Sequence, residues 1–150
     1  MNTPFTYHLM RQEEVSEVCA LVNRVFSAFV APMYAVEGVQ EFLSHVQPEK
    51  LLRRLNHNHT VVVAEKGARL VGMIEMRNSD HVSLFFVEGH EQGKGIGRGL
   101  MNYLIEMKAC EHISVHASPN STAAYETLGF TSEGPLETKN GITYMPMKKM

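Results

Sequence analysis

The sequence predicts an α/β (α+β) fold that forms a single domain over residues 1–150, and three observations support this. Extended segments with alternating or continuous apolar side chains are interspersed with stretches whose apolar residues recur at helical spacing. Short polar turns join some extended segments directly, as in antiparallel hairpins. A glycine-rich turn, followed by a helix and then a strand, predicts a right-handed crossover between parallel neighbours. A chain of 150 residues is also long enough to bury one core of its own.

The N-terminal third is predicted to be a strand followed by helices. Residues 5–11 alternate as a strand does, and apolar side chains recur at helical spacing over residues 12–30. After Pro32 two short helices are expected, because apolar residues in 39–46 share a face and Pro48 suits the first turn of a helix. We expect these two helices to form a cover over the sheet.

Three strands are predicted in the middle of the chain. The first is β-branched and covers 60–65, and a turn at 66–68 leads into the second at 70–77. After a further turn at 78–80, residues 81–88 form a nearly continuous apolar run, which is typical of a strand covered on both faces. This third strand is therefore expected near the centre of the sheet.

The C-terminal part alternates helices and strands. A helix after the glycine-rich turn is indicated by apolar residues at Ile96, Leu100, Met101, Leu104 and Met107. A strand at 112–117 follows, and the pair 118–119 begins another helix, which Gly129 ends. Asn-Gly at 140–141 favours a tight turn, and so a second hairpin, before a last strand at 142–148.

Composition excludes several classes of protein. No apolar run approaches the ~20 residues that span a bilayer, and the N-terminus lacks a secretory signal, so the expected location is the cytoplasm without membrane insertion. A net charge of -2 favours no nucleic-acid partner. Cys19 and Cys110 stand far apart, which fits reduced thiols on helix faces better than a disulfide framework or a zinc site. His57 and His59 lack a third ligand at suitable spacing, so no metal site is expected.

The glycine-rich segment 92–98 predicts a site for a phosphate or pyrophosphate. Glycine lets the backbone approach a ligand, and the free N–H groups of the following helix attract anions. The alternative is a glycine turn that serves only chain reversal or close helix packing. The dinucleotide pattern GxGxxG fails at Arg98 and Leu100, and a Walker-type loop fails at Glu88 and Gly95.

The segment QGKGIG resembles the acetyl-CoA-binding pattern [QR]xxGx[GA] of the GNAT superfamily of N-acetyltransferases. The resemblance implies a central mixed, mostly antiparallel sheet of six to seven strands flanked by about four helices, with a parallel strand pair at the CoA cleft. It also implies that exposed backbone at Phe86 and Val87 pairs with the pantetheine arm. Gly89 departs from the proline common in the family. The pyrophosphate would be held by N–H groups of Gln92, Gly93, Lys94, Gly95, Ile96, Gly97 and Arg98.

The segment ASPNSTAAYETLGF resembles the second hallmark of the same superfamily, a helix that carries a tyrosine and ends in LGF. Tyr125 stands at the position of the tyrosine, and the resemblance gives it the role of general acid toward the leaving thiolate. The alternative for Tyr125 is a buried aromatic whose hydroxyl meets a carbonyl. Asn120 either contacts pantetheine or caps the helix. Residues 30–58 match least and lie where such enzymes build the acceptor pocket.

The implied reaction is direct transfer of an acetyl group from acetyl-CoA to a primary amine in a ternary complex, which requires a group that takes a proton from the amine. A turn at 78–80 would pair Arg77 with His81, Glu75 with Ser83 and Met73 with Phe85 on one face. His81 is the preferred base, since its usual pKa is near ~6.5, and Glu75 is the second candidate. Both could instead belong to an ordinary polar hairpin face. His116 could line the same cleft, although a lone histidine on a strand is more often structural.

Two other functions stay open on the sequence. The chain could be a non-catalytic module that binds CoA or acyl-CoA, or an acyltransferase with a longer acyl donor. The acceptor could be a small-molecule or peptide amine, and the mildly acidic charge balance slightly favours a cationic one. A homodimer through the C-terminal strands is possible in this fold.

Overall fold

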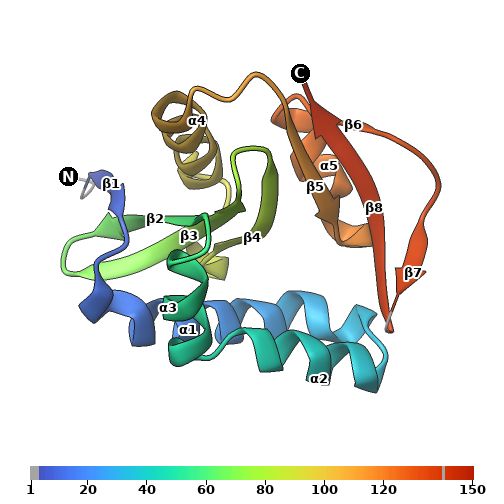
Figure 1. Ribbon diagram of the computed structural model, residues 1–150, viewed down its shortest axis with the longest axis horizontal. Helices are drawn as coiled ribbons and strands as arrows, with labels where there is room; N and C mark the ends of the chain where they lie inside the picture. Colours follow the sequence, from blue (N-terminus) through green and yellow to red (C-terminus); the bar gives the residue numbers. More distant parts are fainter. Residues whose placement is uncertain (1–3, 140) are drawn as a thin grey trace.

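The computed structural model describes residues 4–139 and 141–150 and shows one sheet with helices on both faces (Figure 1). The strands are β1 Phe5–Leu9, β2 His59–Lys66, β3 Arg69–Arg77, β4 His81–Val87, β5 Ile113–Ala117, β6 Thr131–Ser132, β7 Glu137–Lys139 and β8 Ile142–Lys149. The α-helices are α1 Val15–Val25, α2 Val36–His45, α3 Pro48–Leu55, α4 Ile96–Lys108 and α5 Thr122–Thr127. Single helical turns are η1 Gln12–Glu14, η2 Phe26–Val30, η3 Ala31–Met33, η4 Gly89–Glu91 and η5 Pro119–Ser121.

The sheet is mixed and mostly antiparallel, as predicted. Its strand order is β1-β2-β3-β4-β5-β8-β6, with β7 paired to β8, and β4–β5 is the parallel pair. Within the described residues it has eight strands, one more than the upper end of the expected range. The excess comes from β6 and β7, which have two and three residues and so are too short to show an alternating pattern. β7 pairs with β8 antiparallel, as the predicted hairpin requires, while Asn140 in its predicted turn lies outside the described residues.

Two apolar cores lie on opposite faces of the sheet. On one face α1 and α3 bury their apolar sides against β2 and β3, through residues that include Val18, Leu21, Val22, Leu51, Val63 and Met73. On the other face α4 packs with β5 and α5, through residues that include Ile96, Leu100, Leu104, Val115, Tyr125 and Phe130. Figure 1 shows α1, α2 and α3 on one side of the sheet and α4 on the other. β2 and β3 are therefore covered on both faces along most of their length, whereas the second half of β4 is only partly buried.

The helical stretch that contains α1 is long and apolar. It runs over Gln12–Met33, 22 residues, and passes by length and composition alone as a stretch able to cross a membrane. In the fold, however, α1 has a buried stripe that packs on the sheet, made of Val15, Val18, Cys19, Leu21, Val22 and Val25. A core helix passes the same length and composition test, so the stretch is explained by this packing. The absence of membrane insertion stays a prediction.

The predicted pairing of β3 with β4 is correct at the turn and wrong beyond it. Arg77 pairs with His81, but Glu75 pairs with Leu84 instead of Ser83, and Met73 pairs with Phe86 instead of Phe85. The cause is a β-bulge at Ser83, one extra residue that the β3 side does not match. The Ser83 hydroxyl donates to the Glu75 carbonyl at 3.3 Å, so the bulge is held by β3 itself.

The bulge lies where β4 and β5 separate. Only two pairs join these parallel strands, His81 with Ser114 and Val82 with Val115. A bulge bends its strand and increases the local twist, so the sheet opens after Val82. This gap in the centre of the sheet positions the candidate site.

Candidate functional site

A cleft of about 720 Å³ occupies the gap between β4 and β5. It extends from the glycine-rich loop before α4 along β4 to His116 on β5, with α5 on one side and η2 on the other. Its η2–α2 wall is aromatic: the rings of Phe26 and Phe42 stack at 3.8 Å, and Phe42 meets Phe86 edge-on at 5.8 Å. The two ends of the cleft therefore differ, one built from backbone amides and the other from side chains.

The glycine-rich loop leaves its backbone open to the cleft. Gly93 and Gly95 have φ of 81° and 86°, in the left-handed region that favours glycine. A Cβ added to either residue would meet no described atom within 4 Å. Since Gly99 N–H donates to the Gly95 carbonyl as the first bond of α4, the N–H groups of the preceding turn have no intrahelical partner. Those donors and the helix dipole favour an anion at this place, and binding of one stays a prediction.

The residues predicted to bind the cofactor lie together with one exception. The cleft is lined by Phe86, Val87, Gln92, Gly93, Gly95, Ile96, Gly97, Arg98 and Asn120. Lys94 is not among these lining residues, and its ammonium pairs with Glu91 at 2.9 Å. The Val87 carbonyl accepts from the Gln92 side-chain amide at 3.0 Å, so this acceptor at the end of β4 is already in use.

Glu91 anchors the glycine-rich loop, a role that no motif in the sequence predicts. Its side chain is 2% exposed and pairs with Lys94 and, at 3.1 Å, with Lys66 of β2. Hydrogen bonds from Lys94 and then Lys66 lower the pKa of Glu91 to about 2, so it is ionised at neutral pH. No motif in the sequence marks the contact with Lys66, because it joins residues 25 positions apart.

Tyr125 lies on α5 at the α4 side of the gap. The residue is 8% exposed, and its ring packs edge-on against Phe85 at 5.9 Å and Phe130 at 5.4 Å. Burial raises the pKa of the Tyr125 hydroxyl far above its usual value, so it stays protonated. It makes no hydrogen bond with another described residue, although buried tyrosine hydroxyls usually have a partner. This side chain is a proton donor available to a ligand in the cleft.

Asn120 connects the two walls of the cleft. Its Nδ2 donates to the Phe29 carbonyl of η2 at 2.8 Å, and its Oδ1 accepts from Ser118 Oγ at 2.9 Å. The Phe29 ring in turn lies over Gly89, where an added Cβ would come within 2.8 Å of it. This contact accounts for glycine where the resemblance leads one to expect proline.

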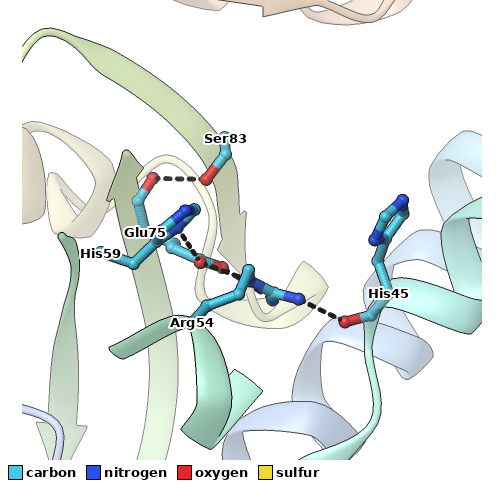
Figure 2. Close-up of polar contacts among 5 residues, drawn as sticks. All are labelled: His45, Arg54, His59, Glu75 and Ser83. Atoms are coloured by element: carbon cyan, nitrogen blue, oxygen red, sulfur yellow. Dashed lines mark hydrogen bonds and ion pairs between the residues drawn. The ribbon is translucent and has the colours of Figure 1, made fainter. Parts of the chain in front are cut away.

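Glu75 belongs to a buried ion cluster outside the residues that line the cleft (Figure 2). Arg54 contacts both carboxylate oxygens, at 2.7 and 3.0 Å, and His59 Nδ1 lies 2.7 Å from Oε2. Arg54 also donates to the His45 carbonyl at 2.8 Å, which ties the end of α2 to β3. The Glu75 side chain is 1% exposed, so it has no access to a substrate. His59, expected to be solvated, is part of this cluster.

His81 is buried next to the cleft without lining it. Its Nδ1 lies 2.8 Å from the Ser114 hydroxyl, and its ring meets that of His116 edge-on at 4.9 Å. Burial, then the charge of Arg77, lowers the pKa of His81 to about 4, so it is neutral at pH 7. The histidine that does line the cleft is His116.

One further group has metal-ligating side chains. Among the described residues, ligand atoms of His8, Glu14 and Glu65 lie within 4.8 Å of one another. Glu14 already pairs with Arg11, and the group lies by β1 and β2, away from the cleft. It has no part in the candidate site.

Comparison with known proteins points to one family. The model of the acetyltransferase (GNAT) domain matches residues 30–150. The fold is similar to a GCN5-related N-acetyltransferase from Rhodopseudomonas palustris, with a TM-score of 0.81 at 17% identity over 99% of this chain and 97% of that one. It is also similar to the PaiA N-acetyltransferase from Thermoplasma acidophilum in complex with coenzyme A, with a TM-score of 0.79 at 16% identity over 97% and 98%. No curated protein matches the chain.

Proposed function

We infer the function from one premise: the chain belongs to the acetyltransferase (GNAT) domain family. We propose that it transfers an acetyl group from acetyl-CoA to a primary amine by direct attack in a ternary complex. The observation that carries this proposal is the continuity of the cleft, which joins free amides at the start of α4 to the Tyr125 hydroxyl through the gap between β4 and β5. A binding module needs the amides alone, whereas a transferase also needs a proton donor.

The residues of the cleft fit both the diphosphate and the thioester of acetyl-CoA. The open backbone at Gly93 and Gly95 accepts a diphosphate without displacing a described side chain, and Arg98 brings a positive charge to the same end of the cleft. Acetyl-CoA supplies the activated thioester. The gap holds the pantetheine arm, and the Tyr125 hydroxyl gives its proton to the departing thiolate. The aromatic wall at Phe26 and Phe42 excludes water from the reacting end.

The charge of the cleft supports an acceptor with an apolar body. Among the described lining residues the one carboxylate is Glu91, and two lysines pair with it. A polyamine needs anions for its additional positive charges, and this cleft offers none that is unpaired. The aromatic wall instead offers apolar surface beside β4. We therefore propose a primary amine on an apolar or aromatic body, a class different from the cationic acceptor that the overall charge favours.

The test is the release of free thiol from acetyl-CoA by the purified protein with a panel of amines. We expect turnover with 2-phenylethylamine at a kcat/KM at least about tenfold above that with spermidine, because each unpaired charge brought into the cleft costs more than about 1.4 kcal/mol. Acetyl-CoA should also raise the melting temperature. Stabilisation by acetyl-CoA without turnover of any amine would replace the transferase by a CoA-binding module. Faster turnover with butyryl-CoA would replace acetyl as the donor.

A further inference from the structure

His116 is the first residue of β5 beyond its pairing with β4. The last pair between the parallel strands is Val82 with Val115, and His116 is the next residue of β5. It is exposed and lines the cleft. Because β4 has bent away at the Ser83 bulge, the His116 side chain stands at the apex of the gap, where the cleft narrows onto the sheet.

His116 and Tyr125 reach the gap from opposite faces of the sheet. Ile113, Val115 and Ala117 of β5 point into the core that contains α4 and Tyr125. Side chains alternate along a strand, so His116 points to the other face, the one covered by α1 and α2. Both side chains line the same cleft. A thioester in the gap would thus have a proton donor on one side and an imidazole on the side from which an acceptor enters.

Rings of two neighbours fix the orientation of His116. Tyr144 of β8 stacks on it at 4.2 Å with an angle of 16° between planes, and His81 of β4 meets it edge-on. Neither ring nitrogen of His116 makes a hydrogen bond with another described residue, so both are free for a ligand. This differs from His81, whose Nδ1 contacts Ser114 Oγ. It differs also from Glu75, whose two oxygens contact Arg54.

Partial burial in the cleft, followed by the net effect of the surrounding charges, lowers the pKa of His116 and keeps it neutral at pH 7. Burial and Arg77 of β3 lower its pKa, Lys139 of β7 lowers it further, and Glu137 of β7 raises it. His81 on β4 is neutral in the same range, and Tyr144 on β8 packs against the ring without a charge of its own. A neutral imidazole with an open nitrogen can accept a proton.

We propose that His116 is the general base that takes the proton from the acceptor amine, an inference that rests on the proposed function. The neutral amine attacks the thioester carbonyl, a C–N bond forms and the C–S bond breaks. One N–H proton goes to His116, and the Tyr125 proton goes to the sulfur. His116 then releases its proton, through solvent, to the Tyr125 oxygen. The balance is one amine and one thioester to one amide and one thiol.

The test compares His116→Gln and His116→Ala with His112→Gln, a matched change at an exposed histidine outside the cleft. We expect kcat to fall about 100-fold or more in both His116 variants, with acetyl-CoA affinity by calorimetry unchanged. The acid limb of the kcat profile against pH should disappear in His116→Gln. Added imidazole should restore activity to His116→Ala, whereas sodium chloride of the same ionic strength should not. The His112 variant should match the wild type.

Two outcomes would overturn the role of His116 alone, and a third would overturn the proposed function. If the wild-type protein releases thiol with an amine and His116→Gln has the same kcat and pH profile, the base is another group while the transferase stands. A lower kcat in His116→Ala without imidazole rescue, together with an intact acid limb in His116→Gln, would leave His116 a structural role and exclude proton transfer. If the wild-type protein turns over no amine at all, the proposed function itself fails.

Discussion

Tyr125 was singled out by resemblance, and the fold shows how its side chain is held. Its ring is held by Phe85 and Phe130, so the position of the hydroxyl depends on packing. The hydroxyl itself has no partner among the described residues, and burial keeps it protonated. The aromatic packing and the proton therefore belong to different parts of one side chain and can be separated by substitution.

We predict that Tyr125→Phe lowers kcat about 10- to 100-fold and leaves the affinity for acetyl-CoA within about twofold, because the ring contacts remain and the proton donor is lost. Steady-state thiol release and calorimetry measure the two quantities. Tyr103, a partly exposed tyrosine of α4 outside the cleft, is the control, and Tyr103→Phe should change neither. An unchanged kcat in Tyr125→Phe would exclude the role of general acid.

Glu75 and His81 show where residue-level reasoning fails. Their shared strand pair was predicted correctly only as far as Arg77 with His81. Nothing in the sequence marks Ser83 as a bulge, and nothing indicates that Arg54, 21 positions before Glu75, reaches both oxygens of its carboxylate. A buried ion pair between distant segments depends on how helices and strands dock, which local patterns do not encode. The catalytic assignment of both residues stays a prediction.

At the scale of elements, the glycine-rich loop and α4 work as one unit. The loop turns through two left-handed glycines so that α4 begins with its free N–H groups at the cleft, and Glu91 ties it to β2. Gly97 lies in the first turn of α4, where an added Cβ would approach Phe85 no closer than 3.4 Å. A side chain can therefore be introduced here without breaking the helix.

We predict that Gly97→Glu abolishes binding of acetyl-CoA, since a carboxylate would stand among the amides that receive the diphosphate. Gly97→Gln, of the same size but neutral, separates charge from volume and should retain more affinity by at least tenfold. Calorimetry measures both, and circular dichroism checks that α4 remains folded. Equal affinities for the two variants would mean that the free N–H groups at the start of α4 do not hold an anion.

At the scale of the whole molecule, the opening between β4 and β5 lies between the two cores, so side chains from both faces of the sheet reach it. His81 lies at the base of this opening, buried against Ser114, with Arg77 and His116 beside it and Asp80 adjacent. Its folded pKa of about 4 lies below its usual value of 6.5, so between these values the unfolded chain binds the proton more readily. Stability is accordingly unaffected by His81 above pH 6.5 and falls as the pH drops from 6.5 toward 4.

We predict that the free energy of unfolding decreases between pH 6.5 and pH 4 and that His81→Gln makes this decrease smaller, because the group that must be kept neutral is absent. Urea denaturation at a series of pH values measures the slope. His57→Gln, at an exposed turn, is the matched control and should keep the slope of the wild type. A slope in His81→Gln as steep as that of the wild type would show that other groups cause the acid sensitivity.

The sequence alone predicted the family, which the match to the GNAT domain model confirms, and the order of the main strands and helices. It also predicts the anion site before α4. These follow from short-range patterns: apolar periodicity, glycine at turns, and two motifs whose residues are neighbours along the chain. The tertiary structure decided which polar side chains face the cleft. In the fold, Glu75 lies in an ion cluster, His81 is buried, and His116 is exposed at the apex of the gap. The bulge at Ser83 in β4 and the docking of α3 set the surroundings of these three side chains. Both depend on contacts between segments that are distant along the chain.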